Sequence, residues 1–498
     1  MLDKRDLIFI ILIFIIIIFS FYFIGIFSVG HQLNDDGVLF GLYDILQEKS
    51  FSQTILEYFK TGEIIRFRPL YYPYLIFKVH LFGLNIFYNL LFTTILGCIS
   101  ITFFYIGMRK LNCSIYESFL FICLMFLGNQ IVIIQRNDPN ETIGVFFLSI
   151  AFFFITIRSK YLSLIFSSFF LILSSLCKES FTVMIPSMIF LKLYIDKEYL
   201  NITLKETLKR NILFIIPIFV FFINILFIFN AYRKSSGMYY NESNFFNFLK
   251  QAITLPLRST QFLYCLFITF AVYLTILIKE EINILKYIKN NKYIFIFLLL
   301  AIFPNIVIHA KANLSERYLL PVLFTTAFAC MIIIKNIKKY VWLYKFLIIS
   351  VSLSILPLIY ITCNGTIKHI NESNKVKSFF NVIEKQVNDN SNILVVIRPD
   401  ISWQTSVLTD NYIQHYLNMT PSFLFIESED DKISEYGLIL KDSLSLMYKN
   451  QMYSPDKLYD IIVFFDTKYS DFISYTDISD KKYYLYDSNI IYPIYVKN

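Results

Sequence analysis

The sequence predicts a polytopic α-helical membrane protein with about 11 transmembrane helices and a small C-terminal α/β soluble domain. Of its 498 residues, 56% are hydrophobic and only 16% are charged, whereas a soluble domain carries roughly 25% charged residues. Apolar runs of about 20 residues recur as far as residue 362, and that length crosses a hydrocarbon core of roughly 30 Å. Beyond residue 365 the apolar runs shorten to strand length.

The apolar runs assign residues 1–364 to a transmembrane domain. The first run exceeds a signal-peptide core of roughly 7–15 residues, so we expect an uncleaved anchor. The short runs 161–176 and 181–195 are alternatively one re-entrant hairpin, which leaves the later topology unchanged. The predicted transmembrane helices cover residues 7–29, 86–108, 115–133, 141–157, 161–176, 181–195, 211–232, 260–278, 293–309, 318–334 and 342–362.

Basic residues in the connections predict the orientation, because cytoplasmic connections carry an excess of Lys and Arg. With the N-terminus inside, the inside segments contain 19 Lys and Arg, against 12 in the longer outside segments. The C-terminal domain then lies outside. The first outer connection, 30–71, is long and amphipathic, and VLFGLYDILQEK (38–49) predicts a helix lying on the membrane surface.

The C-terminal residues 365–498 predict a separate α/β domain. Its expected strands are 393–397, 422–426, 461–465 and 490–496, with helical stretches such as SNKVKSFFNVIEKQV between them. This domain has 18 acidic and 13 basic residues, whereas the whole chain has a net charge of +8. The transmembrane domain is therefore strongly basic, which suits binding near anionic lipid or lipid phosphate.

Several function classes find no support in the sequence. The seven cysteines form no CxxC pair, which argues against a disulfide framework and a structural zinc site. A Walker loop, GxGxxG, GxSxG and HExxH are all missing, so a nucleotide-driven transporter or a serine hydrolase is not indicated. No feature indicates a nucleic acid partner.

Two outer connections carry candidate catalytic carboxylates. Asp35 and Asp36 follow the first helix in HQLNDDG, where a carboxylate pair can hold a divalent metal or supply a general base. The alternative is a helix N-cap. Asp138 and Glu141 lie in QRNDPNE between two membrane helices, although an Asp-Pro turn alone accounts for Asp138.

Two other segments carry cations suited to phosphate. Arg66 and Arg68 lie in RFRPLYYPY, and guanidinium matches phosphate oxygens, with headgroup contact as the alternative. Lys178 and Glu179 form the turn CKES, where charges near membrane depth are costly and often functional. The alternative is a salt bridge that holds the loop.

The segment HAKANLSERYLLP, at the outer start of a late helix, carries four further charged or titratable residues. They are His309, Lys311, Glu316 and Arg317. A capped, charged helix start is the alternative explanation. His309 alone is more often structural than catalytic.

Together these features resemble the GT-C superfamily of integral membrane glycosyltransferases. Members have an acidic residue soon after helix 1, membrane-surface helices in the first outer loop and a second acidic residue in the next outer loop. A soluble domain often follows the last span. The matching features here are Asp35–Asp36, residues 38–60, Asp138 with Glu141, and residues 365–498.

The resemblance implies an outward-facing enzyme whose donor is a polyprenyl-phosphate-linked sugar. Asp35 or Asp36 would deprotonate the acceptor hydroxyl, with Asp138 or Glu141 next in line. The donor phosphate would lie among Arg66, Arg68, Lys178, Lys311 and Arg317, and Glu179, His309 and Glu316 are expected substrate contacts. No cofactor is implied with certainty, and a divalent metal stays open.

In size and topology the chain also resembles bacterial and prophage glucosyltransferases that decorate O-antigen. That narrower resemblance implies an O-antigen or similar glycan acceptor at the outer, periplasmic face of the bacterial inner (plasma) membrane. Two alternatives remain. An O-antigen polymerase has a similar number of helices and arginine-bearing outer loops, and a transporter or flippase would place its charges in mid-membrane.

Overall fold

The computed structural model describes residues 3–30, 37–60, 68–137, 139–200, 203–234, 250, 252–254, 259–279, 292–310, 316–388, 391–397, 403–425, 454, 459–464, 483–485 and 494–497. The chain forms two compact units. The helical unit comprises Met1–Ile24, Ile55–Phe77 and Leu90–Ile367, and the sheet unit comprises Gly25–Thr54, Lys78–Asn89 and Lys368–Asn498.

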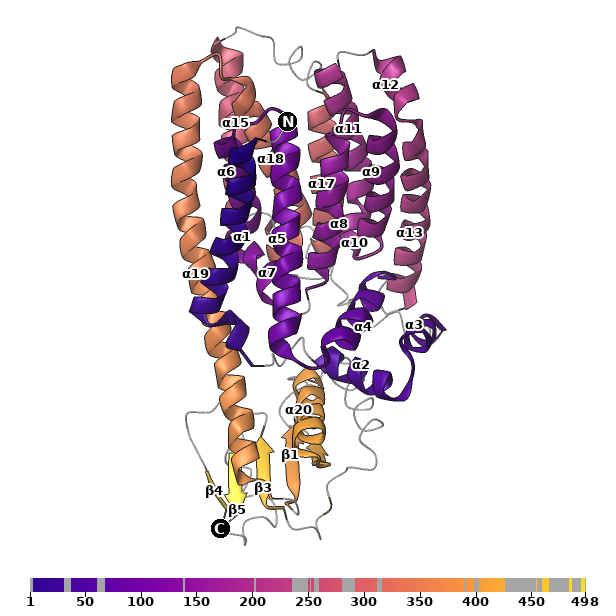
Figure 1. Ribbon diagram of the computed structural model, residues 1–498, viewed down its shortest axis with the longest axis vertical. Helices are drawn as coiled ribbons and strands as arrows, with labels where there is room; N and C mark the ends of the chain where they lie inside the picture. The colour runs from indigo at the N-terminus through magenta and orange to yellow at the C-terminus, as the bar shows by residue number, and fades with distance from the viewer. Residues whose placement is uncertain are drawn as a thin grey trace. The chain divides into compact units, whose positions relative to one another are not determined.

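The helical unit is a bundle of apolar helices that run alongside one another (Figure 1). A described helix occupies each of the predicted transmembrane ranges. The helices are α1 (Lys4–Ile24), α5 (Ile86–Lys110), α6 (Ile115–Phe126), α7 (Val132–Gln135), α8 (Asn140–Ile155), α9 (Lys160–Ser175), α10 (Glu179–Thr182), α11 (Met184–Leu200), α12 (Leu204–Arg210), α13 (Ile215–Lys234), α15 (Thr260–Lys279), α17 (Lys292–Ala310), α18 (Leu320–Asn336) and α19 (Val341–Gln386). The fold class is thus the predicted one, a multi-pass α-helical membrane protein.

Length and composition separate these helices into two groups. Among the described residues, Lys4–Ile24, Ile86–Lys110, Ile212–Asn230 and Val341–Gln386 are each long and apolar enough to cross a membrane alone. Five shorter apolar helices accompany them, at Asn140–Ile155, Lys160–Ser175, Gln261–Ala271, Lys292–Ile308 and Leu320–Asn336. The first helix is apolar on all sides and mostly exposed, as expected of a lipid-facing span.

Aromatic rings fill the centre of the helical unit. Phe104 of α5, Phe152 of α8 and Phe324 of α18 lie against one another with ring centroids 5.2–5.6 Å apart. Gly107 allows this approach, because a Cβ there would lie 2.5 Å from the Phe152 ring. Ring pairs at these distances add packing energy beyond the area they bury.

The predicted continuous helix 115–133 is wrong, because α6 ends at Phe126 and the chain bends by 82° before a 3₁₀ turn and α7. Gly128 has φ +72°, a left-handed conformation that glycine adopts without strain. Two side chains satisfy the interrupted backbone. Thr362 Oγ1 accepts the Gly128 N–H at 2.7 Å, and the Gln261 side-chain amide donates to the Leu124 carbonyl.

The last predicted span, 342–362, is also longer than expected. Helix α19 continues without interruption to Gln386 and includes the stretch that was assigned to a separate helix of the C-terminal domain. Residues 363–375 are mainly polar, but a polar helix can remain helical in water. The change in composition marks a change of surroundings rather than the end of the helix.

The sheet unit has a five-stranded mixed sheet of order β2-β1-β3-β5-β4. Its strands are β1 (Ile393–Ile397), β2 (Ser422–Phe425), β3 (Ile461–Phe464), β4 (Tyr483–Leu485) and β5 (Ile494–Lys497). The first three pair in parallel, and β5 is antiparallel to β3 and β4. The predicted α/β domain is confirmed, although β4 was not expected; of the predicted strand 490–496, the structure describes the part from Ile494.

One apolar core holds the sheet unit together. Val395, Phe423 and Val463 of the sheet pack with Phe379 of α19 and Phe40 of α2 (Gly37–Glu48). Helix α2, predicted to lie on the membrane surface, thus buries Phe40 within this unit and packs along α20 (Trp403–Leu417). The short helices α3 (Phe51–Lys60) and α4 (Tyr71–Phe82) follow α2 in the chain.

Candidate functional site

Four charged side chains from distant parts of the sequence meet in the helical unit. The Arg68 guanidinium lies 3.3 Å from Glu179 (Nη2 to Oε2), and the Lys178 ammonium contacts the Glu141 carboxylate. All four side chains are at most 6% exposed. We call Arg68, Glu141, Lys178 and Glu179 the buried charge cluster.

Local backbone structure positions each member. Glu141 lies in the first turn of α8, after Pro139, where the positive end of the helix dipole favours a carboxylate. Lys178 is the extended residue that precedes α10, and Glu179 begins that short helix. The Leu70 N–H donates to the Leu176 carbonyl at 3.0 Å and so ties the segment carrying Arg68 to the end of α9.

The cluster is electrically balanced, with two cations and two carboxylates. Burial lowers the pKa of Lys178, while the adjacent Glu141 carboxylate works in the opposite direction. Burial also disfavours the charged form of Arg68, but Glu179 and Glu141 outweigh it and raise the pKa of Arg68. Charges so far from water persist only when paired, so each carboxylate keeps its neighbouring cation in place.

Tyr318 joins the cluster from the 3₁₀ turn η4 (Glu316–Leu319). Its ring centroid lies 3.7 Å from the Lys178 ammonium, a cation–π contact in a desolvated place. Tyr318 was not among the residues predicted for the site, which in SERYLLP were the charged Glu316 and Arg317. An aromatic residue directly after Arg317 was the available signal.

The described residues include only part of the predicted site. Within them are Arg68, Glu141, Lys178 and Glu179, which the structure brings together. His309 ends α17 and both Glu316 and Arg317 begin η4, so these three are placed by their backbone alone. Asp35, Asp36, Arg66, Asp138 and Lys311 lie outside the described residues.

A metal site is not evident in the part of the chain that the structure describes, where no three His, Cys, Asp or Glu side chains gather. The two cations of the buried charge cluster are each paired with a carboxylate. Arg68 Nε is buried and has no hydrogen-bond partner among the described residues. Such a donor, beside a second buried cation, fits a phosphate oxygen.

The fold and this site define a multi-pass membrane protein with a buried, charge-balanced cation pair and a small α/β unit. A solved structure with the same fold is ArnT from Cupriavidus metallidurans, crystallised with undecaprenyl phosphate. The likeness covers 99% of this chain and 98% of that one, with a TM-score of 0.50 and 10% sequence identity. No protein-family model and no curated protein matches the chain. The chain therefore has the fold of ArnT, and its function has to be argued from the site.

Proposed function

We propose that the protein is an integral membrane glycosyltransferase that moves a sugar from a polyprenyl-phosphate donor to a glycan acceptor. The observation that carries the proposal is the buried charge cluster, found in a fold shared with ArnT. That protein was crystallised with undecaprenyl phosphate, and a donor of the same phosphate chemistry suits Arg68 and Lys178 here.

The two cations would stabilise the leaving group. As the bond between the anomeric carbon and the phosphate oxygen breaks, the electron pair passes to the phosphate and negative charge grows there. Arg68 and Lys178, held by Glu179 and Glu141, are preorganised donors at low dielectric, where such stabilisation is largest. The aromatic ring of Tyr318 helps to keep Lys178 protonated.

The division of labour among the carboxylates follows from their partners. Glu141 and Glu179 are buried and paired with cations, so their task is to hold those cations. The general base is then Asp35 or Asp36, with Asp138 as the next candidate. That base takes the proton of the acceptor hydroxyl, whose oxygen attacks the anomeric carbon. Direct attack inverts the configuration at that carbon.

The proposed setting follows from the positive-inside rule. The N-terminus is cytoplasmic, and the C-terminal domain and the catalytic loops face the periplasm or the exterior of a bacterial inner membrane. A nucleotide sugar in the cytoplasm cannot reach such a site, whereas a lipid-borne donor can. The acceptor is an O-antigen or similar cell-surface glycan, and residues 365–498 help to choose it.

Donor recognition can be tested by binding alone. Purified full-length protein is titrated with polyprenyl phosphate and with the corresponding polyprenol, which lacks the phosphate. The wild type should prefer the phosphate form, and Arg68→Gln should weaken that binding by about tenfold or more, because a charged hydrogen bond is worth roughly 1.5–3 kcal/mol.

Arg109→Gln is the matched control, because Arg109 also pairs with a buried carboxylate, at 2.6 Å from Asp6, within the same unit. It should leave the preference for the phosphate intact. Equal binding of polyprenol and polyprenyl phosphate by the wild type would refute the proposed donor.

A further inference from the structure

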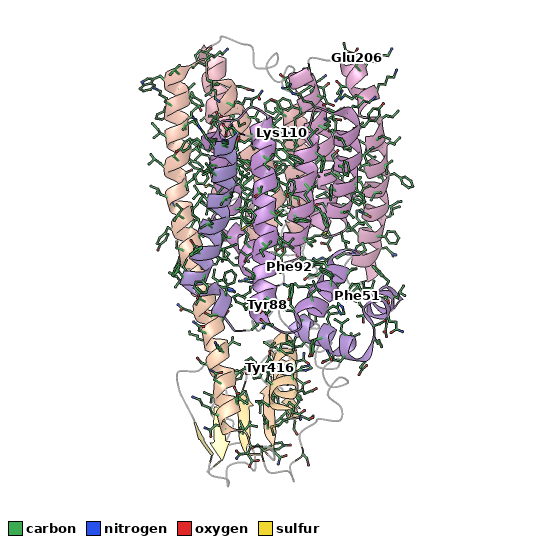
Figure 2. All side chains as sticks on the ribbon, in the orientation of Figure 1. Phe51, Tyr88, Phe92, Lys110, Glu206 and Tyr416 are labelled. Atoms are coloured by element: carbon green, nitrogen blue, oxygen red, sulfur yellow. The ribbon has the colours of Figure 1, made fainter. Side chains whose placement is uncertain are left out.

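A second charged site lies in the helical unit, near the ends of α5, α8 and α11. An open hollow of about 280 Å³ is lined there by Lys110, Thr156, Arg158 and Asp196 among its polar residues. Figure 2 shows Lys110 and Glu206 towards the same end of the helices. This end is distinct from the buried charge cluster, because Glu141 and Ile155 lie at opposite ends of α8, roughly 20 Å apart by helical rise.

Helix carboxyl ends normally repel anions, since their last carbonyls are unpaired. Here cations cover those carbonyls. The Lys192 ammonium donates to the Ile155 carbonyl at 3.2 Å, and Arg210 Nη2 donates to the Arg158 carbonyl at 2.7 Å. The Lys335 ammonium also donates to the Leu111 carbonyl. These three carbonyls therefore oppose an anion less than unpaired carbonyls would.

Asp196 is the buried carboxylate that lines the hollow, and its oxygens already have hydrogen-bond partners. Its carboxylate lies 2.8 Å from the Lys192 ammonium and accepts a second hydrogen bond of 2.8 Å from the Asn211 amide. Arg210 Nε lies 3.6 Å away. Asp196 therefore fixes Lys192 and Arg210 and has little charge left to offset the cations at the rim.

Two cations remain at the rim. The side chains of Lys110 and Arg158 are exposed, and within the described part of the chain neither forms an ion pair with a carboxylate. The Lys110 ammonium lies 5.6 Å from the centroid of the Phe153 ring, a cation–π contact. Among the residues that line the hollow, two cations therefore face one carboxylate, and that carboxylate is already paired with Lys192 and Arg210.

We propose that this hollow binds a phosphate group, and that the phosphate belongs to an anionic lipid headgroup in the leaflet at this end of the helices. Basic pockets between transmembrane helices recognise such headgroups. The hollow is open to its surroundings, which suits a headgroup better than a whole glycolipid that needs an enclosing pocket. Free phosphate shares the chemistry and is the alternative source.

The test compares lipid retention by native mass spectrometry. Purified full-length protein is given equal amounts of phosphatidylglycerol and phosphatidylcholine, with and without millimolar inorganic phosphate. The site variant is Lys110→Gln with Arg158→Gln. Its matched control is Lys205→Gln with Lys209→Gln, which removes two exposed cations from α12 without touching the hollow.

The wild type should retain phosphatidylglycerol over phosphatidylcholine, and the site variant should lose this preference by about tenfold or more. The control variant should keep it. Displacement of the lipid by inorganic phosphate would overturn the lipid assignment, whereas persistence of the lipid supports it. An equal loss in both double variants, or no preference in the wild type, would overturn the site itself. All four residues are exposed, so both variants should melt near the wild-type temperature.

Discussion

The Arg68 guanidinium and the Glu179 carboxylate lie 3.3 Å apart, and both side chains are only 6% exposed although 111 residues separate them in sequence. Burying two charges costs several kcal/mol per ion, and their attraction often no more than offsets that cost. A well-packed apolar pair would serve the fold as well. A buried pair of this kind is more readily explained by recognition of a charged ligand than by stability.

This explanation makes a prediction about stability. Arg68→Met should destabilise the protein by about 3–5 kcal/mol, because Glu179 is left charged and buried without its partner. Arg68→Met combined with Glu179→Leu should recover most of the melting temperature but not the binding of polyprenyl phosphate. A double variant that melts as low as the single one would mean that the pair serves the fold.

The contact between Lys178 and Tyr318 predicts a difference between two substitutions. Tyr318→Leu removes the ring whose centroid lies 3.7 Å from the ammonium, and with it about 1–2 kcal/mol of cation–π interaction. Tyr318→Phe keeps the ring face and therefore this interaction. Donor affinity should fall more in Tyr318→Leu than in Tyr318→Phe. Equal affinities would show that the ring face contributes nothing to the site.

Close packing beneath the cluster predicts a sensitive glycine. A Cβ at Gly144 of α8 would lie 2.3 Å from the ring of Phe181, which is buried in α10 three residues after Lys178. Gly144→Ala should therefore lower stability by about 1–3 kcal/mol and disturb the site. Phe181→Leu in the same chain should restore part of the loss. Thermal melting measures the change in stability, and donor binding measures the disturbance of the site. A Gly144→Ala protein with wild-type melting temperature and donor affinity would contradict this packing.

The sheet unit should respond to pH through Asp410. Burial raises the pKa of Asp410 to about 6, above its ordinary value of 3.8. A carboxyl whose folded-state pKa is raised favours the folded state while it is protonated. Stability is therefore highest below the unfolded pKa, and it falls as the pH rises from about 4 through about 6. The difference between a pKa of 3.8 and one of about 6 corresponds to about 3 kcal/mol of stability.

Hydrogen exchange of the α20 amides in the full-length protein measures this effect, after correction for intrinsic exchange. Protection should be higher at pH 5 than at pH 7, and Asp410→Asn should reduce the difference. The comparison with Asp410→Asn isolates the carboxyl, and an unchanged difference in that variant would rule out Asp410 as its source.

The membrane helices could be predicted from the sequence because lipid imposes one requirement on every span, a long apolar run. The structure departs from the prediction where the path of the backbone does not follow the polarity of the sequence. By hydropathy, residues 115–133 form one continuous apolar run. The bend within this run depends instead on the left-handed backbone conformation of Gly128 and on side chains of distant helices. Helix α19 was divided at residue 362 because polarity changes there while the backbone continues.

The candidate site divides in a similar way. Charges near membrane depth are costly and often functional, so Arg68, Glu141, Lys178 and Glu179 were recognisable one by one. Their pairing was not, because it depends on how α8, α10 and the segment before α4 pack. Tyr318 was missed for a related reason, since an aromatic residue at the end of a span is common and becomes informative only beside Lys178.

The catalytic base is expected at the carboxylate pair after the first helix. Asp35→Asn or Asp36→Asn should lower sugar transfer by roughly 10²–10⁴-fold without affecting insertion or melting temperature, the usual contribution of a positioned base. Kinetics with purified variants measures this. Near-normal turnover with both residues changed would exclude the pair and leave Asp138 as the candidate.

The most direct test of the central claim is sugar transfer by the purified full-length protein, with a radiolabelled polyprenyl-phosphate sugar as donor and a lipid-linked glycan as acceptor. The wild type should form labelled glycan and release polyprenyl phosphate in equal amounts. Arg68→Gln should lose most of this activity, whereas Arg109→Gln, the matched change at the 2.6 Å Asp6 pair, should retain it. Full transfer by a folded Arg68→Gln protein, or no transfer from any polyprenyl-phosphate sugar by the wild type, would contradict the account.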